Sequence, residues 1–482
     1  MGNNHSFHIL NHSHKSVLPN SSSSKTDLQP KTVSPVEHLS PMEKLGKLLA
    51  QRSLQEDSIN GVACGVFKRY LFPHYTEIGK RLFSYLCTSS CGPASSHVIS
   101  VSNFKTQTEK LLGIMSDHQL IQIYVTMYAD GKDKMVIDQF HELVYAVYKL
   151  AMDHYPDGPQ SCRYIFTTIK AVVDSAFHKK SELKTTYLAN WITHNCPRLI
   201  LLLHRYIVHV LSTGYRSIIE KPQVEPSELE LTTPVLEKTP SFEVRQPLLP
   251  VSQVWILATT LPQLYIQPTQ HHSSPCMAPT FLSKIMDLSC PSHWTLLYNS
   301  NQHGIGTNRF LHHVLGYRGP TLTFLRGSED VEFCLAATDE WRESHLFWGG
   351  EDCMLIQILP LYKVVEKGAK LVYLNTSIRG YPLGIRVGAD PRAPSLQVDQ
   401  SFDKLTYCGI PYALNNMEVW GCSSPKSREI QLQIKDWEVK QAESNRKVKI
   451  TSSDWLDHPD RYLLELAGRT SYATGGSSSS AS

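Results

Sequence analysis

The sequence has no long apolar run. Its longest, from Leu199 to Leu211, contains two histidines and an arginine and is shorter than the roughly 20 residues that a membrane-spanning helix needs. At the N-terminus only Phe7 to Leu10 is apolar, which is too little for a secretory signal. We therefore expect neither a transmembrane segment nor a secretory signal.

Paired cysteines and an excess of charge are missing too. The 11 cysteines are an odd number without a repeated short spacing, which argues against a disulfide framework and for a reducing compartment. The formal net charge of +3 is too small for the concentrated basic face of a nucleic-acid-binding protein. No nucleic-acid partner is expected.

What the sequence does have is enough apolar residues for more than one core. Its 482 residues, 41% of them hydrophobic, exceed the roughly 250 to 300 residues at which a single core stops growing. Ser40-Pro41-Met42-Glu43 is typical of a helix start. Apolar residues at helical spacing follow, as in Val136 to Met152, Cys162 to Phe177 and Leu188 to Leu211. Residues 40–221 are predicted to be an all-α domain.

A loop between two of these predicted helices resembles a calcium-binding loop. With Asp130 as its first position, Ile137 falls on the apolar eighth position. Lysines stand at two ligand positions, Met135 replaces the turn glycine, and His141 stands where a bidentate glutamate is required. We expect an EF-hand-like helix pair that holds no calcium.

Three segments have the composition of unstructured chain. Residues 1–39 are rich in Ser, Asn, His and Pro, and residues 471–482 are rich in Ser. Residues 222–250 carry six prolines, a density that blocks regular structure. We predict a disordered arm, a disordered tail and, between the two halves of the chain, an extended linker.

Residues 251–422 show a different pattern, in which short apolar runs alternate with Gly, Pro, Asp and Asn and favour antiparallel strands. Strands are predicted at 294–298, 321–325, 332–336, 354–359, 370–374 and 417–420, with helices at 251–264, 281–288 and 308–315. The expected fold class is α+β: an all-α EF-hand-like domain, an antiparallel β-sandwich with flanking helices and a packed interior, and a C-terminal helical segment at 423–470.

Four motifs of this region are similar to those of a TLDc domain. They are Trp294-x-Leu-Leu-Tyr-x-Ser-x-x-His-Gly304, Gly319-Pro320-Thr321, Phe347-Trp348-Gly349-Gly350 and Glu418-Val419-Trp420-Gly421. The N-terminal Met1-Gly2-Asn3, the segment from Trp191 to Pro197 and the stretch from Asp454 to Gly468 resemble EAK-type TLDc proteins. The strand at Leu383 to Arg386 departs from the family pattern, and a Cys-x-Thr-Phe-x-Asn segment has no counterpart near Leu396 to Thr406.

The resemblance implies a non-enzymatic regulator without a cofactor. TLDc proteins bind the V1 sector of the vacuolar proton pump (the V-ATPase), and EAK-type members are myristoylated, sit on the lysosomal surface and act in TOR signalling. By resemblance we expect V-ATPase V1 subunits and TOR pathway components as partners. We also expect a cytoplasmic protein that is peripheral on lysosomal or endosomal membranes.

The first six residues fit an N-myristoylation pattern, with Gly2 as the acylated residue and Ser6 at the expected offset. One myristoyl chain gives only reversible attachment, with a partition constant on the order of 10⁴ M⁻¹, so stable residence requires a second contact. The lysines of the arm are too sparse to be a polybasic patch. The second contact is therefore expected to be a protein.

The C-terminal segment is a hypothetical docking element. Alternating charges from Lys426 to Lys449 predict a helix that has Ile430, Ile434 and Trp437 available for burial. The apolar residues predicted to bind a partner are Trp455, Leu456, Tyr462, Leu463 and Leu466. They can fill a groove on a pump subunit or fold back on the TLDc domain, since an amphipathic helix serves either use.

Candidate catalytic groups are few, and no catalytic, metal-binding or cofactor-binding residue is predicted. His303 and the pair Glu351-Asp352 have no recognisable nucleophile beside them, so we expect His303 to be a turn residue whose imidazole bonds to the backbone. Cys334, Cys353, Cys408 and Cys422 lie in or beside apolar strands and are expected to act as small hydrophobes. The alternative function is protection against oxidation, which would need a low-pKa thiolate.

Overall fold

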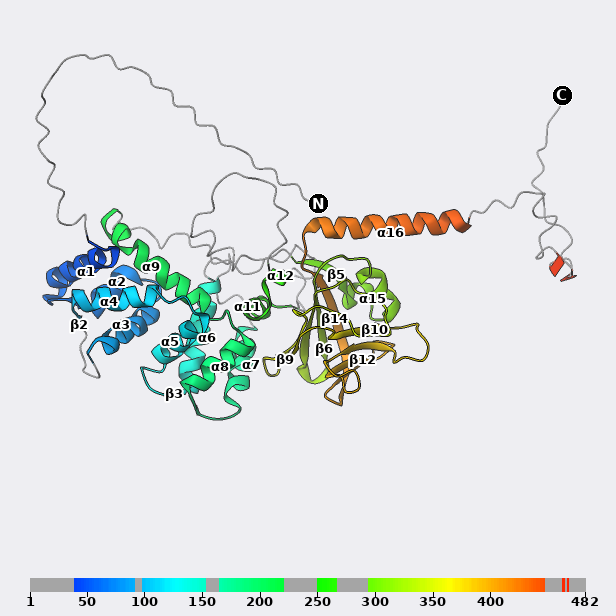
Figure 1. Cartoon of the computed structure of the whole chain (residues 1–482), viewed down its shortest axis with the longest axis horizontal. Coiled ribbons are helices and arrows are strands. Elements are labelled where there is room, and N and C mark those ends of the chain that lie inside the picture. Colours follow the sequence, from blue (N-terminus) through cyan, green and yellow to red (C-terminus); the bar gives the residue numbers. More distant parts are fainter. Residues whose placement is uncertain are drawn as a thin grey trace, which may run out of the picture. The chain divides into compact units, whose positions relative to one another are not determined.

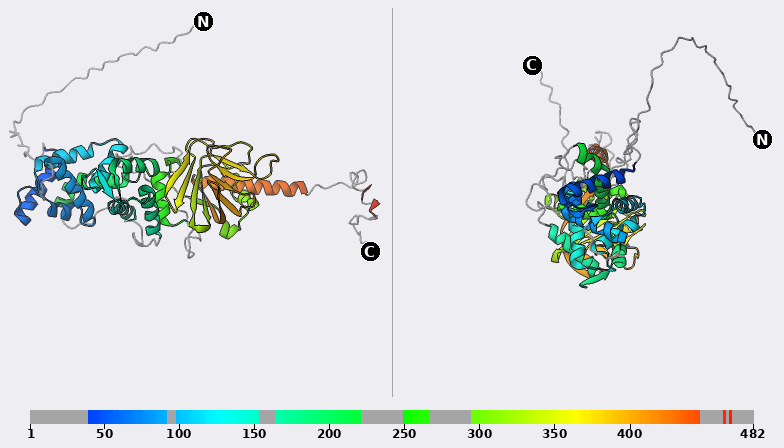
Figure 2. Two further views of the ribbon diagram at one scale, coloured as in Figure 1. Left: turned by 90° about the horizontal axis from the view of Figure 1, so that it is seen from below. Right: turned by 90° about the vertical axis from the view of Figure 1, so that its left-hand side faces the viewer.

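The computed structural model describes residues 39–91, 98–152, 164–220, 249–266, 294–446, 462–463 and 466–467. Helices predominate in these residues as far as α12, and strands predominate from β5 to β14 (Figures 1 and 2). A helical region, a large antiparallel sheet and a C-terminal helix thus follow one another, which confirms the predicted α+β class. None of the described helices is both long and apolar enough to cross a membrane.

The helical region is built from four helix–loop–helix units, each with a short strand in its loop. The units are α1 (Pro41–Asp57), β1 (Val62–Ala63) and α2 (Cys64–Leu71); α3 (Thr76–Cys91), β2 (Val98–Ile99) and α4 (Val101–Leu112); α5 (Asp117–Tyr128), β3 (Lys134–Val136) and α6 (Ile137–Met152); α7 (Ile165–Phe177), β4 (Glu182–Lys184) and α8 (Thr185–Asn195). Strand β1 pairs with β2, and β3 pairs with β4. The four described units therefore form two pairs. The sequence had indicated only one of these units, the one that contains Asp130.

The buried apolar residue of this loop is not the one that the calcium-loop numbering from Asp130 places at the eighth position. Met135, not Ile137, is the central residue of β3, where it pairs with Leu183 and is fully buried. Ile137 instead begins α6 and is only half-buried. Burial of Met135 in the core fixes the register of β3 against β4. Because Met135, Val136 and Ile137 are all apolar, the sequence did not show which of them would be buried.

Prolines break two helices that were predicted to be continuous. The stretch from Leu188 to Leu211 is divided into α8 and α9 (Leu201–Glu220), with Pro197 between them. The predicted helix from Val251 to Leu264 is divided into α11 (Val251–Thr260) and α12 (Gln263–Ile266) at Pro262. A proline lacks the N–H that continues a helix and restricts the residue before it.

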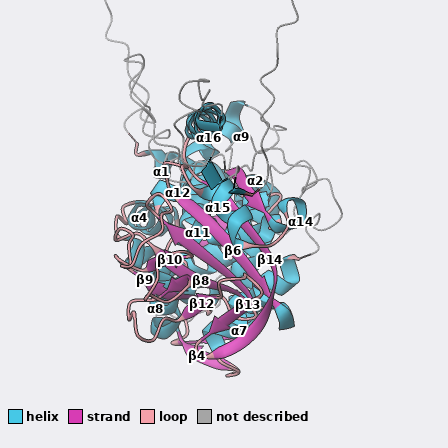
Figure 3. Ribbon diagram, turned by 90° about the vertical axis from the view of Figure 1, so that its right-hand side faces the viewer, coloured by secondary structure: helices cyan, strands magenta, loops and turns pink. Residues whose placement is uncertain are grey.

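A single antiparallel sheet folds over into the two layers of a sandwich. Its strands are β5 (Thr295–Asn299), β6 (Thr321–Gly327), β7 (Glu332–Ala337), β8 (Met354–Leu359), β9 (Lys363–Lys367), β10 (Val372–Asn375), β11 (Gly384–Val387), β12 (Leu396–Val398), β13 (Lys404–Tyr407) and β14 (Ile410–Gly421). The order is β10-β11-β12-β13-β14-β6-β7-β8-β9, with β5 also paired to β14. The start of β14 pairs with β13 and its end with β5 and β6, so this long strand belongs to both layers (Figure 3).

All six predicted strands are present, and α15 (Thr307–Val314) is the predicted helix at 308–315. The strand predicted from Lys370 begins only at Val372, because Lys370 has a positive φ of 55°. The strand noted at Leu383 to Arg386 is β11, shifted by one residue, and three strands were missed: β9, β12 and β13. The last two lie in the stretch from Leu396 to Thr406, where no family segment had been recognised. The helix predicted at 281–288 lies outside the described residues.

The outer face of one sandwich layer packs against the helical region. Side chains from β6, β7 and β8 belong to the same hydrophobic core as those of the helices. Backbone groups join at the same place: Val364 N–H donates to the side-chain carbonyl of Asn195, and Tyr362 N–H donates to the carbonyl of Ala171, both at 3.0 Å. A separate core between the two layers includes Phe310, Phe333 and Val419. Strands β6 to β8 are therefore buried on both faces.

Candidate functional site

The C-terminal helix α16 (Pro425–Arg446) follows β14 and is attached to the end of α15. Gln431, which is fully buried, donates through Nε2 to the carbonyls of His313, Val314 and Leu315 at 3.1, 3.3 and 2.9 Å. Lys435 Nζ donates to the carbonyl of His312. The last carbonyls of a helix have no partner within that helix, so α16 supplies the C-terminal cap of α15.

Beyond this attachment, α16 presents apolar side chains to solvent. Ile430 is 38% exposed, Leu432 47%, Val439 55% and Trp437 63%. The helix predicted over Lys426 to Lys449 is thus present, but Ile430 and Trp437 are exposed and Ile434 is half-buried. A large aromatic side chain that is mostly exposed on a helix is typical of a binding surface.

Of the predicted partner-binding residues, three can be located. Tyr462, Leu463 and Leu466 are 73%, 64% and 75% exposed. Trp455 and Leu456 lie outside the described residues, as does the predicted acylation site Gly2. The apolar side chains of α16 therefore form the more completely described candidate surface, and partner binding by Tyr462, Leu463 and Leu466 stays a prediction.

His303 is the turn residue that was predicted. Its Nδ1 accepts a hydrogen bond from Asn299 N–H at 3.1 Å at the end of the short helix α14 (Ser300–His303), and Gly304 follows with a φ of 78°. The imidazole stacks on that of His313, with 3.8 Å between ring centroids. Burial and the nearby positive charges lower the pKa of His303. Its role in the fold is thus to close the turn after β5.

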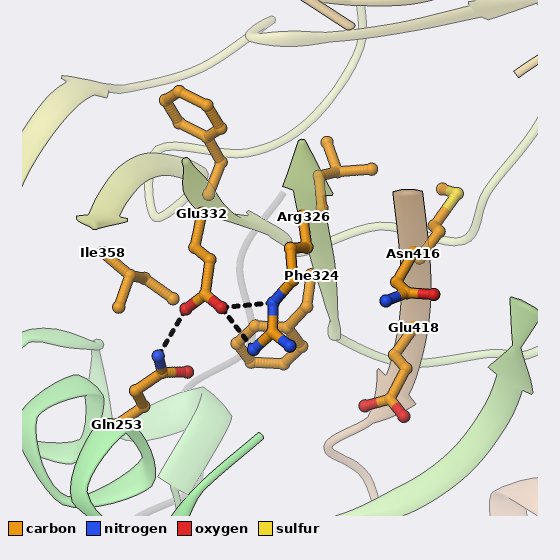
Figure 4. Close-up of a pocket in the computed structure, with 10 residues that line it drawn as sticks. Gln253, Phe324, Arg326, Glu332, Ile358, Asn416 and Glu418 are labelled. Carbon is orange, nitrogen blue, oxygen red and sulfur yellow. Dashed lines mark hydrogen bonds and ion pairs between the residues drawn. The ribbon is translucent and has the colours of Figure 1, made fainter. Parts of the chain in front are cut away.

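A small pocket lies where α11 meets the sandwich (Figure 4). Glu332 on β7 accepts hydrogen bonds from the Gln253 amide on α11 and from Arg326 on β6. Glu418 and Asn416 come from β14 on the other side of Arg326 (Figure 4). No serine, cysteine or histidine is among the described residues that line this pocket. The arrangement suits a polar joint between two elements better than a reaction centre.

Burial dominates the protonation of both carboxyl groups at this joint. It raises the pKa of Glu418 to about 7, although the Trp420 indole N–H, 3.1 Å away, and the charge of Arg326 oppose the shift. Asn299 Nδ2 donates to the other carboxyl oxygen of Glu418 at 2.7 Å. Burial also raises the pKa of Glu332, against the charge of Arg326 and the bond from Gln253. Protonation of Glu418 therefore changes near neutral pH.

In the loop that resembles a calcium site, a guanidinium contacts the acidic residues. Arg81 on α3 forms ion pairs with Asp130 and with Glu142, the latter at 2.6 Å. Gln139 Nε2 donates to the other oxygen of Asp130 at 2.9 Å. Among the residues that the structure describes, no group of three or more His, Cys, Asp or Glu side chains is placed to hold a metal ion. Arg81 thus joins the first pair of helix–loop–helix units to the second.

The cysteines differ in exposure. Cys334, Cys353 and Cys422 are buried as expected, but Cys408 is exposed, because it lies with a φ of 46° in the turn between β13 and β14. Burial raises the pKa of the thiols of Cys334, Cys353 and Cys422. A raised pKa keeps these thiols protonated and poorly nucleophilic.

The fold and its attached helix define a two-layer antiparallel sandwich that carries a helical region on one face and a partly exposed helix at its C-terminal end. Residues 271–439 match the TLDc domain family, and they include the described strands β5 to β14 and most of α16. The chain therefore contains a TLDc domain, as the four motifs had indicated.

Several curated fungal proteins named Restriction of telomere capping protein 5 are similar to this chain. The Lachancea thermotolerans protein is 25% identical over 333 residues, which cover 60% of this chain and 56% of that protein. The Zygosaccharomyces rouxii protein is 24% identical over 256 residues, covering 39% and 46%. A Saccharomyces cerevisiae protein is 29% identical over 182 residues, covering 30% and 31%. The chain spans about half the length of the first two relatives.

Proposed function

We propose that this protein is a non-enzymatic adaptor at the cytosolic face of lysosomes or endomembranes. In this proposal its TLDc domain and C-terminal helix bind the V1 sector of the vacuolar proton pump, and it is linked to TOR signalling as EAK-type TLDc proteins are. The observation that carries the proposal is the pair of exposed apolar side chains Ile430 and Trp437, which lie seven residues apart on one face of α16, the helix that the buried Gln431 attaches to the TLDc domain. With the half-buried Ile434 between them, they have the spacing of the aromatic and aliphatic anchors on which helix-in-groove recognition depends.

The membrane part of the proposal rests on acylation of Gly2. A single myristoyl chain supports only reversible attachment, so the pump would provide the second contact. Loss of the lipid is then expected to weaken membrane residence without removing the pump-binding surface. Membrane attachment and pump binding can therefore be tested separately.

The test is affinity capture of V1 subunits from lysosomal membranes with the full-length chain. Replacement of Trp437 and Val439 by alanine should abolish capture and leave the melting temperature unchanged, because both side chains are more than half exposed. Met115→Ala, at a 91% exposed position on the helical region, is the matched control. Undiminished capture by the double variant would refute docking through α16.

The same capture with Gly2→Ala tests the lipid. We expect the variant to be recovered from the soluble fraction while it still binds solubilised V1 subunits. Truncation after Cys422 is a less direct test than the double variant, because it also removes Gln431 and so exposes the end of α15. A fall in melting temperature on truncation would therefore not by itself distinguish docking from folding back.

Thiol-based protection against oxidation is the second candidate, and the exposed Cys408 is the observation that favours it. The buried cysteines weigh against it, since burial raises the pKa of their thiols. Consumption of peroxide by the purified protein with a thiol reductant, lost in Cys408→Ser, would support this function and contradict a purely non-enzymatic role.

A further inference from the structure

Six basic side chains meet where α14, α15 and α16 come together. We call them the α15–α16 cationic cluster; they are His303, Arg309, His312, His313, Arg428 and Lys435. The rings of His303 and His313 stack at 3.8 Å between centroids, and His312 meets His313 edge to face at 5.0 Å. Arg428 and Lys435 lie on the same face of α16 as Gln431, three residues before it and four after it.

The neighbours of Gln431 place these cations beside the imidazoles. Gln431 bonds to the carbonyls of His313 and Leu315, and Lys435 bonds to the carbonyl of His312. Arg309 Nη1 donates to the carbonyl of His303 at 3.0 Å. Arg309 and His312 are exposed, and the other four are half-buried. The cluster is thus held by backbone contacts while its outer members are open to solvent.

Negative charge is scarce around the cluster. Within the described part of the chain, no ion pair involves the three histidines, Arg309 or Lys435. Burial and four positive neighbours, His303, His312, Lys435 and Arg428, lower the pKa of His313 to about 4. Burial and Arg428 lower the pKa of Lys435 to about 8, with Glu438 acting in the opposite direction. Tyr298 on β5 is the neutral neighbour of both stacked rings.

We propose that the α15–α16 cationic cluster binds a phosphate group. Guanidinium, ammonium and imidazolium groups all donate charge-assisted hydrogen bonds to phosphate oxygens, and a phosphate has enough acceptors to contact several of them at once. A dianion would be attracted to the charges of Arg309, Arg428 and Lys435 and would favour protonation of the adjacent imidazoles. Glu438 is a carboxylate that acts on Lys435. The phosphate can belong to a small soluble compound or to a lipid headgroup.

Binding of phosphate should be linked to protonation. A bound dianion favours the charged form of the nearby imidazoles, so it raises their pKa. By linkage, protonation of an imidazole strengthens binding of the dianion, whereas protonation of the phosphate itself, whose second pKa is about 6, weakens it. The pKa of His313 in particular should rise, because positive neighbours add to burial in lowering it and a bound dianion would offset their charge.

The first test is NMR of the histidine ring protons during titration of the full-length protein with inorganic phosphate, against chloride at equal ionic strength. We expect saturable shifts of the His312 and His313 signals and a rise in the pKa of His313. The double variant Arg309→Gln and His312→Gln, at exposed positions, should weaken binding by about tenfold or more. Arg379→Gln, at an exposed arginine between β10 and β11, should leave it unchanged.

The second test distinguishes the source of the phosphate. The Gly2→Ala chain, which cannot be myristoylated, is sedimented with phosphatidylcholine vesicles with or without a phosphorylated inositol lipid. Binding to the phosphoinositide vesicles alone indicates a lipid headgroup, and NMR shifts without vesicle binding indicate a soluble phosphate compound. Absence of both NMR shifts and vesicle binding would overturn the proposal. The pump-capture assay is independent of both, because its variants lie outside the cluster.

Discussion

The amide of Gln431 on α16 donates to the carbonyl of Leu315, 2.9 Å away at the end of α15. Gln431 also bonds to the carbonyls of His313 and Val314. Through these contacts α16 caps the C-terminal end of α15. The apolar residues of α16 are exposed farther along the same helix. The orientation of the candidate docking surface therefore depends on this buried amide, together with the bond from Lys435 to the carbonyl of His312.

Replacing Gln431 by alanine is expected to destabilise the protein by about 1–3 kcal/mol, the range for leaving buried polar groups without a partner. The carbonyls of His313, Val314 and Leu315 would lose the Gln431 donor, although Val314 keeps the bond from Tyr317 N–H, and the base of α16 would loosen. Urea unfolding measures the first effect, and limited proteolysis within α16 measures the second. Gln433→Ala, at an exposed position two residues away, is the control; equal effects of the two variants would contradict the capping role.

Glu418 should make stability depend on pH near neutrality. Its pKa is raised to about 7 in the folded protein, so between about pH 4.5 and pH 7 the native state binds more protons than the unfolded state, and the free energy of unfolding falls as pH rises. The loss is on the order of 3 kcal/mol across that window and stops above it. Glu332, whose pKa is also raised, adds to the same trend.

Glu418→Gln should flatten this slope without abolishing it. Glutamine keeps an acceptor for Asn299, but its amide NH₂ meets the Trp420 N–H, so the pH dependence is more informative than the absolute stability. Urea unfolding at pH 5.5, 6.5, 7.5 and 8.5 gives the comparison. Glu429→Gln on the exposed part of α16 should retain the wild-type slope, and an unchanged slope in Glu418→Gln would show that another group is responsible.

Arg81→Met should cost about 1 kcal/mol, because it removes two ion pairs whose acidic partners are about half exposed. The loss should shrink in high salt. Lys134→Met removes the more exposed pair with Glu182 and should have no measurable effect. We further expect calcium chloride to leave the melting temperature of the wild-type protein unchanged; an increase would show that the loop at Asp130 binds the ion after all.

Asn195→Ala should weaken the contact between the helical region and the sandwich. The buried side chain of Asn195 donates to the carbonyl of Trp191 and accepts from Val364 N–H, both at 3.0 Å. Loss of the acceptor leaves a buried N–H without a partner, at a cost of about 1–3 kcal/mol. Calorimetry should show a lower transition temperature, whereas Asn190→Ala on the exposed side of the same helix should not; identical traces would mean that this contact is not maintained in solution.

The residues alone were sufficient for those elements whose pattern is local. Strand β8, with a run of apolar residues between turns, was predicted with its observed ends, and α15 and the start of α1 were predicted to within a residue. Each depends on periodicity or capping within a few neighbouring residues. Short strands such as β12, with three residues, and β9, with two lysines at its ends, carry too little local signal. They are strands because their neighbours in the sheet pair with them.

The sequence by itself determined the α+β class, the TLDc domain and the amphipathic C-terminal helix, because these follow from repeated local patterns and ordered motifs. Only the tertiary structure decided the pairing of the helix–loop–helix units, the joint of Gln253 with Glu332, the cap that Gln431 provides and the meeting of three histidines with Arg428 and Lys435. These contacts join residues about 80 to 130 positions apart in several cases. No short window of sequence contains both partners, so burial and pairing in the folded chain bring them together.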